Sequence, residues 1–99
     1  MNPSPHPSMV TKELTIINKL GLHARPAAMF VKVSSAHDAE VWVEKDEEQV
    51  NGKSIMGLMM LAAGCGARII VSADGKDEAE VMEKLEALVA GGFTEGSAK

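Results

Sequence analysis

The 99-residue sequence is poor in cysteine and in aromatic side chains, with one cysteine, one tryptophan, two phenylalanines and no tyrosine. Because Cys65 has no second cysteine to pair with, no disulfide can form within the chain. The fold is therefore expected to be stable with a reduced thiol, as in the cytoplasm. Only Trp42, Phe30 and Phe93 offer rings on which nucleic-acid bases stack.

Positive charge and long apolar runs are scarce as well. Ten Lys and Arg residues against 14 Asp and Glu residues give a net charge of −4, so no basic surface is expected and no nucleic-acid partner. No apolar run approaches the roughly 20 residues that a membrane helix needs. The opening MNPSPHPS also lacks the apolar centre of a signal peptide. We therefore expect a cytoplasmic protein without membrane insertion.

Motifs for cofactors and metals are incomplete. Gly52-Lys53-Ser54 resembles the end of a phosphate-binding P-loop, but the glycine required five positions earlier is replaced by Glu47. One cysteine and three scattered histidines have none of the spacings of metal ligands. We expect neither a cofactor nor a metal site. His37 is interpreted as a helix C-terminal cap or a solvated residue.

The composition divides the chain into one domain and two short tails. Three prolines alternate within residues 1–8, which favours an extended tail. Patterned sequence occupies residues 9–94, and residues 95–99 form a C-terminal tail. A chain of this length folds as one domain without staples but cannot enclose a deep active site. Any chemistry should therefore lie near the surface.

Apolar periodicity predicts strands and helices in the order β-α-β-β-α-β-α. Alternation predicts strands from Val10 to about Ile16, at Val41–Val43, at Gln49–Val50 and from Ile69 to Asp74. Helical spacing predicts helices from His23 to about Ala36, from Ser54 to Leu61, and over Val81–Val89. Gly64-Cys65-Gly66 is expected to end the second helix and Gly91-Gly92 the third.

The alternating strands predict the fold class. A strand that alternates apolar and polar residues is covered on one face only, so the helices must gather on one side of the sheet. We expect an α+β fold, an open-faced β-sandwich with a four-stranded antiparallel sheet and three helices on one face.

The segment Gly21-Leu22-His23-Ala24-Arg25-Pro26-Ala27-Ala28 places a histidine where a turn becomes a helix. Pro26 suits the first helical turn, so His23 should lie at the helix N-terminus. That end favours a neutral imidazole and then an anion attached to it, such as a phosphoryl group. Arg25 brings a permanently charged guanidinium to the same oxygens.

Two motifs resemble those of the histidine-containing phosphocarrier family HPr, which serves the bacterial phosphoenolpyruvate-dependent phosphotransferase system. GLHARPAA is similar to the active-site signature of that family, and Asn51-Gly52-Lys53-Ser54-Ile55-Met56-Gly57 to its regulatory serine segment. The resemblance spans roughly residues 9–93. It implies that Nδ1 of His23 takes a phosphoryl group from enzyme I and passes it to enzyme IIA-type domains, with Arg25 stabilising the phosphate. Such a protein is a monomeric carrier rather than an independent catalyst.

The second motif has a structural and a regulatory interpretation, and the two are compatible. Ser54 precedes an apolar run, which favours a helix N-cap. The resemblance implies phosphorylation of Ser54 by HPr kinase/phosphorylase. It also implies an exposed docking patch made of Ala28, Ile55, Met56 and Met59. The alternative is that the apolar side chains of this helix are simply core.

Other functions stay open at this point. A regulatory binding module of the same fold, of nitrogen-branch or catabolite-control type, would act through the Ser54 segment and use His23 little. A small-molecule sensor of similar layout would need a ligand pocket. The intact GLHARPAA favours the carrier over both. Neither motif distinguishes sugar uptake from the nitrogen-regulatory branch.

Overall fold

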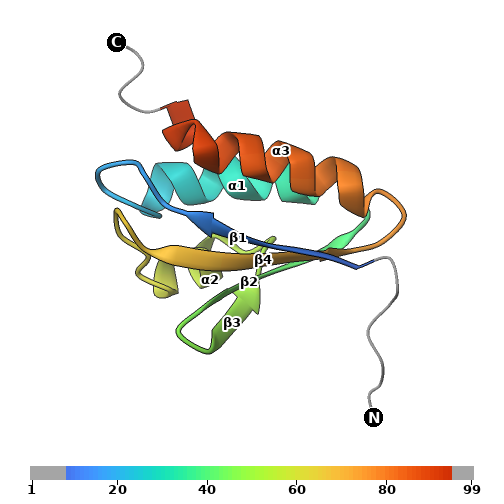
Figure 1. Cartoon of the computed structure of the whole chain (residues 1–99), viewed down its shortest axis with the longest axis horizontal. Coiled ribbons are helices and arrows are strands. Elements are labelled where there is room, and N and C mark those ends of the chain that lie inside the picture. Colours follow the sequence, from blue (N-terminus) through green and yellow to red (C-terminus); the bar gives the residue numbers. More distant parts are fainter. Residues whose placement is uncertain (1–8, 95–99) are drawn as a thin grey trace.

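One antiparallel sheet carries the fold, and its strands lie in the order β1-β4-β2-β3 (Figure 1). The computed structural model describes residues 9–94. The strands are β1 (Val10–Thr15), β2 (Glu40–Lys45), β3 (Glu48–Asn51) and β4 (Arg68–Asp74). The helices are α1 (Ala24–Ser35), α2 (Ile55–Met60), α3 (Glu78–Ala90) and a short 3-10 turn, η1 (Gly92–Thr94). The predicted tails at residues 1–8 and 95–99 lie outside the described residues.

The helices cover one face of this sheet, as the strand pattern predicts. Val41 and Val43 of β2 are fully buried, whereas Trp42 between them is only half-buried on the other face. Helices α1 and α3 lie side by side over the buried face (Figure 1). The short helix α2 packs against α1 and β3, and its Leu58 joins the same core. The open-faced α+β fold and its element order are confirmed, and β1 and β3 form the two edges of the sheet.

The end of α2 lies within one residue of the predicted Leu61, but a glycine does not cause it. The helix stops at Met60 with Leu61 as its C-cap, before Gly64 is reached. Ala62 adopts a φ of +54° and turns the chain at that point. The expectation that Gly64-Cys65-Gly66 ends this helix is therefore wrong. The position of the turn follows from burial, because Leu61 and Ala63 both pack into the core and the chain must turn at Ala62 between them.

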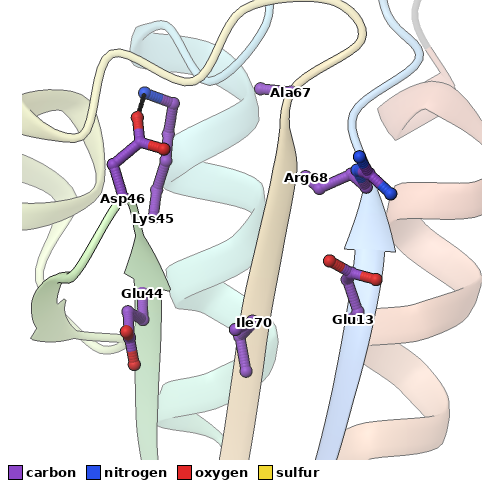
Figure 2. Close-up of a pocket in the computed structure, with 7 residues that line it drawn as sticks. All are labelled: Glu13, Glu44, Lys45, Asp46, Ala67, Arg68 and Ile70. Carbon is purple, nitrogen blue, oxygen red and sulfur yellow. Dashed lines mark hydrogen bonds and ion pairs between the residues drawn. The ribbon is translucent and has the colours of Figure 1, made fainter.

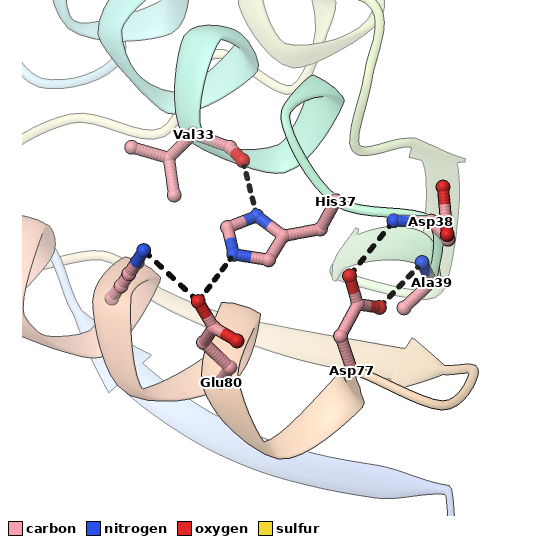
Figure 3. A network of polar contacts seen from close by, with 7 residues as sticks. Val33, His37, Asp38, Ala39, Asp77 and Glu80 are labelled. Atoms are coloured by element: carbon pink, nitrogen blue, oxygen red, sulfur yellow. Dashed lines mark hydrogen bonds and ion pairs between the residues drawn. The ribbon is translucent and has the colours of Figure 1, made fainter.

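His37 caps the C-terminus of α1 from a buried position, so the cap interpretation is confirmed and the solvated one is wrong. Its Nδ1 lies 2.8 Å from the carbonyl oxygen of Val33, and its Nε2 lies 3.6 Å from Oε2 of Glu80 on α3 (Figure 3). Lys84 contacts the same carboxylate at 3.2 Å and lowers the pKa of Glu80. The network ties the end of α1 to the start of α3.

Asp77 reinforces this connection from the residue that precedes α3. Its carboxylate accepts hydrogen bonds from the backbone N–H groups of Asp38, at 2.9 Å, and Ala39, at 2.8 Å (Figure 3). These bonds, with the one from Asp38 contributing most, lower the pKa of Asp77 below its ordinary value of 3.8. The carboxylate thus caps the loop between α1 and β2 rather than its own helix.

Replacement of Asp77 by Asn should lower the melting temperature by several degrees at neutral pH, because the amide keeps only one acceptor oxygen for two N–H groups. A carboxyl group whose pKa is lowered by folding stabilises the protein at any pH above its pKa in the unfolded state. This stabilisation is lost as the pH falls through its pKa in the folded state. The difference between wild type and Asp77→Asn should therefore shrink as pH falls below 3.8. Circular dichroism melts across this range measure it.

The matched control is Asp38→Asn. This change leaves the backbone N–H of residue 38 in place and removes only a 3.8 Å contact between two exposed side chains. It should leave the melting temperature nearly unchanged. Equal effects of the two substitutions at neutral pH would contradict the capping role of Asp77.

Candidate functional site

His23 occupies the N-cap position of α1, at the end of the loop that follows β1. Its backbone is extended, with φ of −82° and ψ of −168°, and its carbonyl oxygen accepts the first helical hydrogen bond from Ala27 at 3.0 Å. The His23 side chain makes no capping hydrogen bond to the first turn. The side chain is half-exposed, so a partner protein can reach the ring. The predicted place of this histidine at the helix start is correct.

The preceding turn is held against the loop that follows α2. Gly21 has a φ of +70°, and a Cβ at this position would overlap the carbonyl oxygen of Ala63. That oxygen accepts a 2.9 Å hydrogen bond from the N–H of Leu22. Only glycine combines the left-handed conformation with so close an approach. The contact brings His23 and the end of α2 to the same part of the surface.

The first turn of α1 offers a site for an anion. Pro26 is its third residue and has no N–H, so the amide donors of this end belong to Ala24 and Arg25. No acidic side chain occupies the first turn. The Arg25 side chain is exposed and lies two residues from His23. Two amides, the helix dipole and a guanidinium therefore all favour negative charge next to the ring.

A shallow hollow of about 300 Å³ adjoins His23. Leu20 and Leu22 line it from the turn, and Met59 lines it from α2. Ala62, Ala63 and Gly64 complete the lining. The structure thus brings the predicted docking residue Met59 to the predicted histidine, across a surface made mostly of apolar side chains.

Ser54 lies at the other end of α2 and caps it. Its Oγ accepts a 3.0 Å hydrogen bond from the N–H of Gly57, so the predicted N-cap is confirmed. Ile55, Met56 and Met59 are 42%, 72% and 43% exposed. The alternative that these three side chains belong to the core is therefore wrong. Ala28 is exposed on α1.

The main chain before Ser54 is anchored to the C-terminal end of α1. Oγ of Ser34 donates to the carbonyl oxygen of Gly52 at 2.8 Å, and Nζ of Lys53 donates to that of His37 at 2.9 Å. Ser34 is not among the predicted site residues. No local pattern reveals these bonds, because they join segments that are 18 and 16 residues apart. They hold the serine segment in place before any partner binds.

Two exposed apolar side chains near the site also escaped prediction. Leu20 is 68% exposed within the turn before His23, and Met60 is 65% exposed at the end of α2. An apolar residue inside a polar, glycine-ended turn is the signal that would have identified Leu20. Met60 is the last helical residue of α2, one residue before the predicted end at Leu61, and it was not among the predicted docking residues.

A second hollow, of about 540 Å³, lies on the open face of the sheet and has a charged lining (Figure 2). Its residues are Glu13, Glu44, Lys45, Asp46, Ala67, Arg68 and Ile70, with Lys45 paired to Asp46 at 2.8 Å. None of these lining residues is a predicted site residue. Within residues 9–94, no group of three or more His, Cys, Asp or Glu side chains is arranged to hold a metal ion. No helix in that range has the length and apolarity to cross a membrane.

Known proteins match the chain over nearly its whole length. Residues 10–91 match the family model described as the PTS HPr component phosphorylation site. The phosphocarrier protein HPr of Neisseria meningitidis is 53% identical over 88 residues, which cover 89% of this chain and 99% of that protein.

Solved structures agree with this match. The crystal structure of HPr-C-His from Thermoanaerobacter tengcongensis has a TM-score of 0.84 and 45% identity, and covers 87% of this chain and 97% of that one. The catabolite repression protein Crh of Bacillus subtilis has a TM-score of 0.69 and 44% identity, and covers 84% of this chain and 95% of that one. The Crh structure is described as a dimer with a swapped domain.

Replacement of Gly21 by Ala should destabilise the protein by more than about 1 kcal/mol, because the new Cβ requires a strained φ and overlaps the carbonyl of Ala63. Urea unfolding measures the change. Gly64→Ala is the matched control, since a Cβ there meets nothing within 4 Å. A stable Gly21→Ala variant would show that the turn is not pressed against Ala63.

Proposed function

The chain belongs to the HPr family of phosphocarrier proteins of the phosphotransferase system, and we propose from this premise that His23 is the residue that carries the phosphoryl group. The supporting observation is the position of the half-buried His23 at the N-terminus of α1, where it lines the surface hollow beside Met59, within the complete motif GLHARPAA. The protein is then a substrate of two successive transfers rather than an independent catalyst.

The proposed transfer exchanges one bond to phosphorus for another. The bond between phosphorus and its donor on enzyme I breaks as Nδ1 of His23 forms the new bond, and the second transfer reverses this on an enzyme IIA-type domain. Arg25 and the first-turn amides stabilise the negative oxygens. The site holds the phosphoryl group at the surface, where stabilisation stays moderate and the onward transfer is not impeded.

We propose that partners dock on the apolar surface beside His23. It comprises the predicted residues Ala28, Ile55, Met56 and Met59, to which the structure adds Leu20 and Met60. Methionine side chains adapt to differently shaped partners, which suits a carrier that meets both enzyme I and enzyme IIA-type domains. We further propose residues 9–94 as the working unit, a cytoplasmic location and a monomeric state, in contrast to the swapped dimer described for Crh.

We propose that HPr kinase/phosphorylase regulates the carrier at Ser54. From Ser54 to Met59 the helix axis advances only about 8 Å, so a phosphate on Ser54 lies within roughly one Debye length of the hollow beside His23. The phosphate would be stabilised at the helix start, yet it adds nearly two negative charges to an apolar contact. Transfer is then inhibited without unfolding.

The second candidate is a regulatory binding module, and the likeness to Crh favours it. Such a protein would use the α2 surface and would not need His23. The presence of a histidine at the helix start supports the carrier instead. Phosphorylation by enzyme I discriminates between the two functions.

Incubation with phosphoenolpyruvate and enzyme I should place about one acid-labile, base-stable phosphate on each wild-type chain, and none on His23→Ala. Mass spectrometry before and after acid treatment measures it. His37→Gln is the control and should still accept about one phosphate on His23, because the ring of His37 is buried in the α1 cap and is not the acceptor. A wild-type chain that accepts no phosphate would exclude the carrier and favour the binding module.

Ser54→Asp should raise the KM for transfer from enzyme I by at least about tenfold, since a negative charge opposes docking. Asp remains a good N-cap, so the helix itself should persist. Ser54→Ala supplies the converse control, because it loses the cap bond to Gly57 but adds no charge. If Ser54→Ala impairs steady-state transfer more than Ser54→Asp does, the loss of transfer comes from the weakened helix cap and not from the added charge.

A further inference from the structure

We propose that Asn18 is a positioning residue for phosphoryl transfer at His23, an inference that rests on the function proposed above. Asn18 lies in the loop between β1 and α1 and is buried, with 6% of its surface exposed. Its Nδ2 donates a 2.8 Å hydrogen bond to the carbonyl oxygen of Gly21. Its own carbonyl oxygen accepts a 3.2 Å bond from the N–H of Gly21. Asn18 therefore holds Gly21 through both its side chain and its main chain.

The Gly21 carbonyl connects Asn18 to the histidine. The N–H of His23 donates to the same oxygen at 2.9 Å, so the donors of Asn18 and His23 converge on one acceptor. At the other end of this peptide unit, the N–H of Leu22 donates to Ala63. The peptide between Gly21 and Leu22 is thus held at both ends. Of the three bonds, the one from Asn18 is the only one made by a side chain.

The position of the imidazole depends on this peptide. Gly21 has a φ of +70° and, as a glycine, little steric resistance to rotation. The bond from His23 to Gly21 closes a tight three-residue turn, and the Asn18 amide is the side-chain donor that fixes the carbonyl end of this peptide. Without this amide the bond from Leu22 to Ala63 still holds the N–H end, but the carbonyl end can shift and carry the main chain of His23 with it. Asn18 does not touch the phosphoryl group and acts only through Gly21.

Phosphoryl transfer between two proteins is sensitive to such a displacement. The reaction needs the ring nitrogen, the phosphorus and the partner atom nearly in line, and a misplacement of about 1 Å costs about 10²-fold in rate. The apolar docking surface, by contrast, lies mainly on α2, and of its residues only Leu20 belongs to the turn that Asn18 holds. Loss of the amide should therefore lower kcat and leave KM for enzyme I nearly unchanged.

The test compares Asn18→Ala with wild type in transfer from phosphorylated enzyme I, well below the melting temperature of both proteins. We expect kcat to fall by at least about tenfold while KM changes by less than about twofold. Asn18→Asp, which keeps the shape but presents no N–H, should behave in the same way. Val81→Ala is the stability control: it weakens the core from the start of α3, at the opposite end of that helix from Gly92, which lies against Asn18, and it should keep the wild-type kcat.

Nuclear magnetic resonance supplies a readout that stability alone does not move. Ring resonances of His23 should shift in Asn18→Ala, while those of His37 stay in place, because His37 bonds to Val33 at the opposite end of α1. In the wild type, the side-chain amide of Asn18 should exchange with solvent more slowly than that of the exposed Asn51, which tests the bond even if both variants fail to fold.

Three results would overturn the proposal. They are a folded Asn18→Ala variant with wild-type kcat, a loss confined to KM, and an Asn18 amide that exchanges as fast as that of Asn51. A wild-type chain that enzyme I does not phosphorylate is a different result. It refutes the proposed function itself.

Discussion

The contact between the turn at Gly21 and the loop at Ala63 is the constraint on which the site depends. Glycine at position 21 lets the main chain of the turn approach the main chain of the loop closely, and the hydrogen bond from Leu22 to Ala63 fixes the position of one relative to the other. Through it, the N-terminus of α1 and the C-terminal end of α2 become one surface. His23 supplies the reactive ring from one side and Met59 an apolar contact from the other. The junction therefore holds next to one another two motifs that lie on separate elements, α1 and α2.

The small size of the fold explains why the site is an exposed one. A single sheet covered on one face leaves no room for an enclosed cavity beside the core, and the hollow next to His23 is shallow and mostly apolar. Selectivity must then come from the shape and charge of the surrounding surface rather than from a closed pocket. This also places Ser54 and His23 on a common surface, with Ser54 at the N-terminus of the six-residue helix α2 and His23, the N-cap residue of α1, near the C-terminal end of α2.

Most of the fold is predictable from the sequence because local patterns and tertiary packing agree. Alternation in Val41-Trp42-Val43 matches burial on one side of β2, and Ser54 makes the cap bond that its type and position predict. The end of α2 was predicted to within one residue but its cause was not, because core packing of Leu61 and Ala63, rather than a glycine, turns the chain. The anchoring bonds from Ser34 and Lys53 and the convergence on Gly21 were not predictable. They depend on which segments meet in space and on the detailed path of the turn.

The free edge of β1 limits how two copies of the chain can associate. Two copies can extend the sheet by pairing their β1 strands antiparallel about a two-fold axis perpendicular to the sheet. In such a pair, each residue lies directly opposite a residue of the other copy whose side chain points to the same face. The two registers that pair most of Val10–Thr15 are centred on Lys12 or on Glu13. The second sets carboxylate against carboxylate, and like charges directly opposed are destabilising. The first sets two Lys12 ammonium groups opposite one another, but each is paired with Glu86 of its own chain at 2.8 Å. The register centred on Glu13 is therefore disfavoured, and any self-association along the outer side of β1, with which no strand of residues 9–94 pairs, should use the register centred on Lys12.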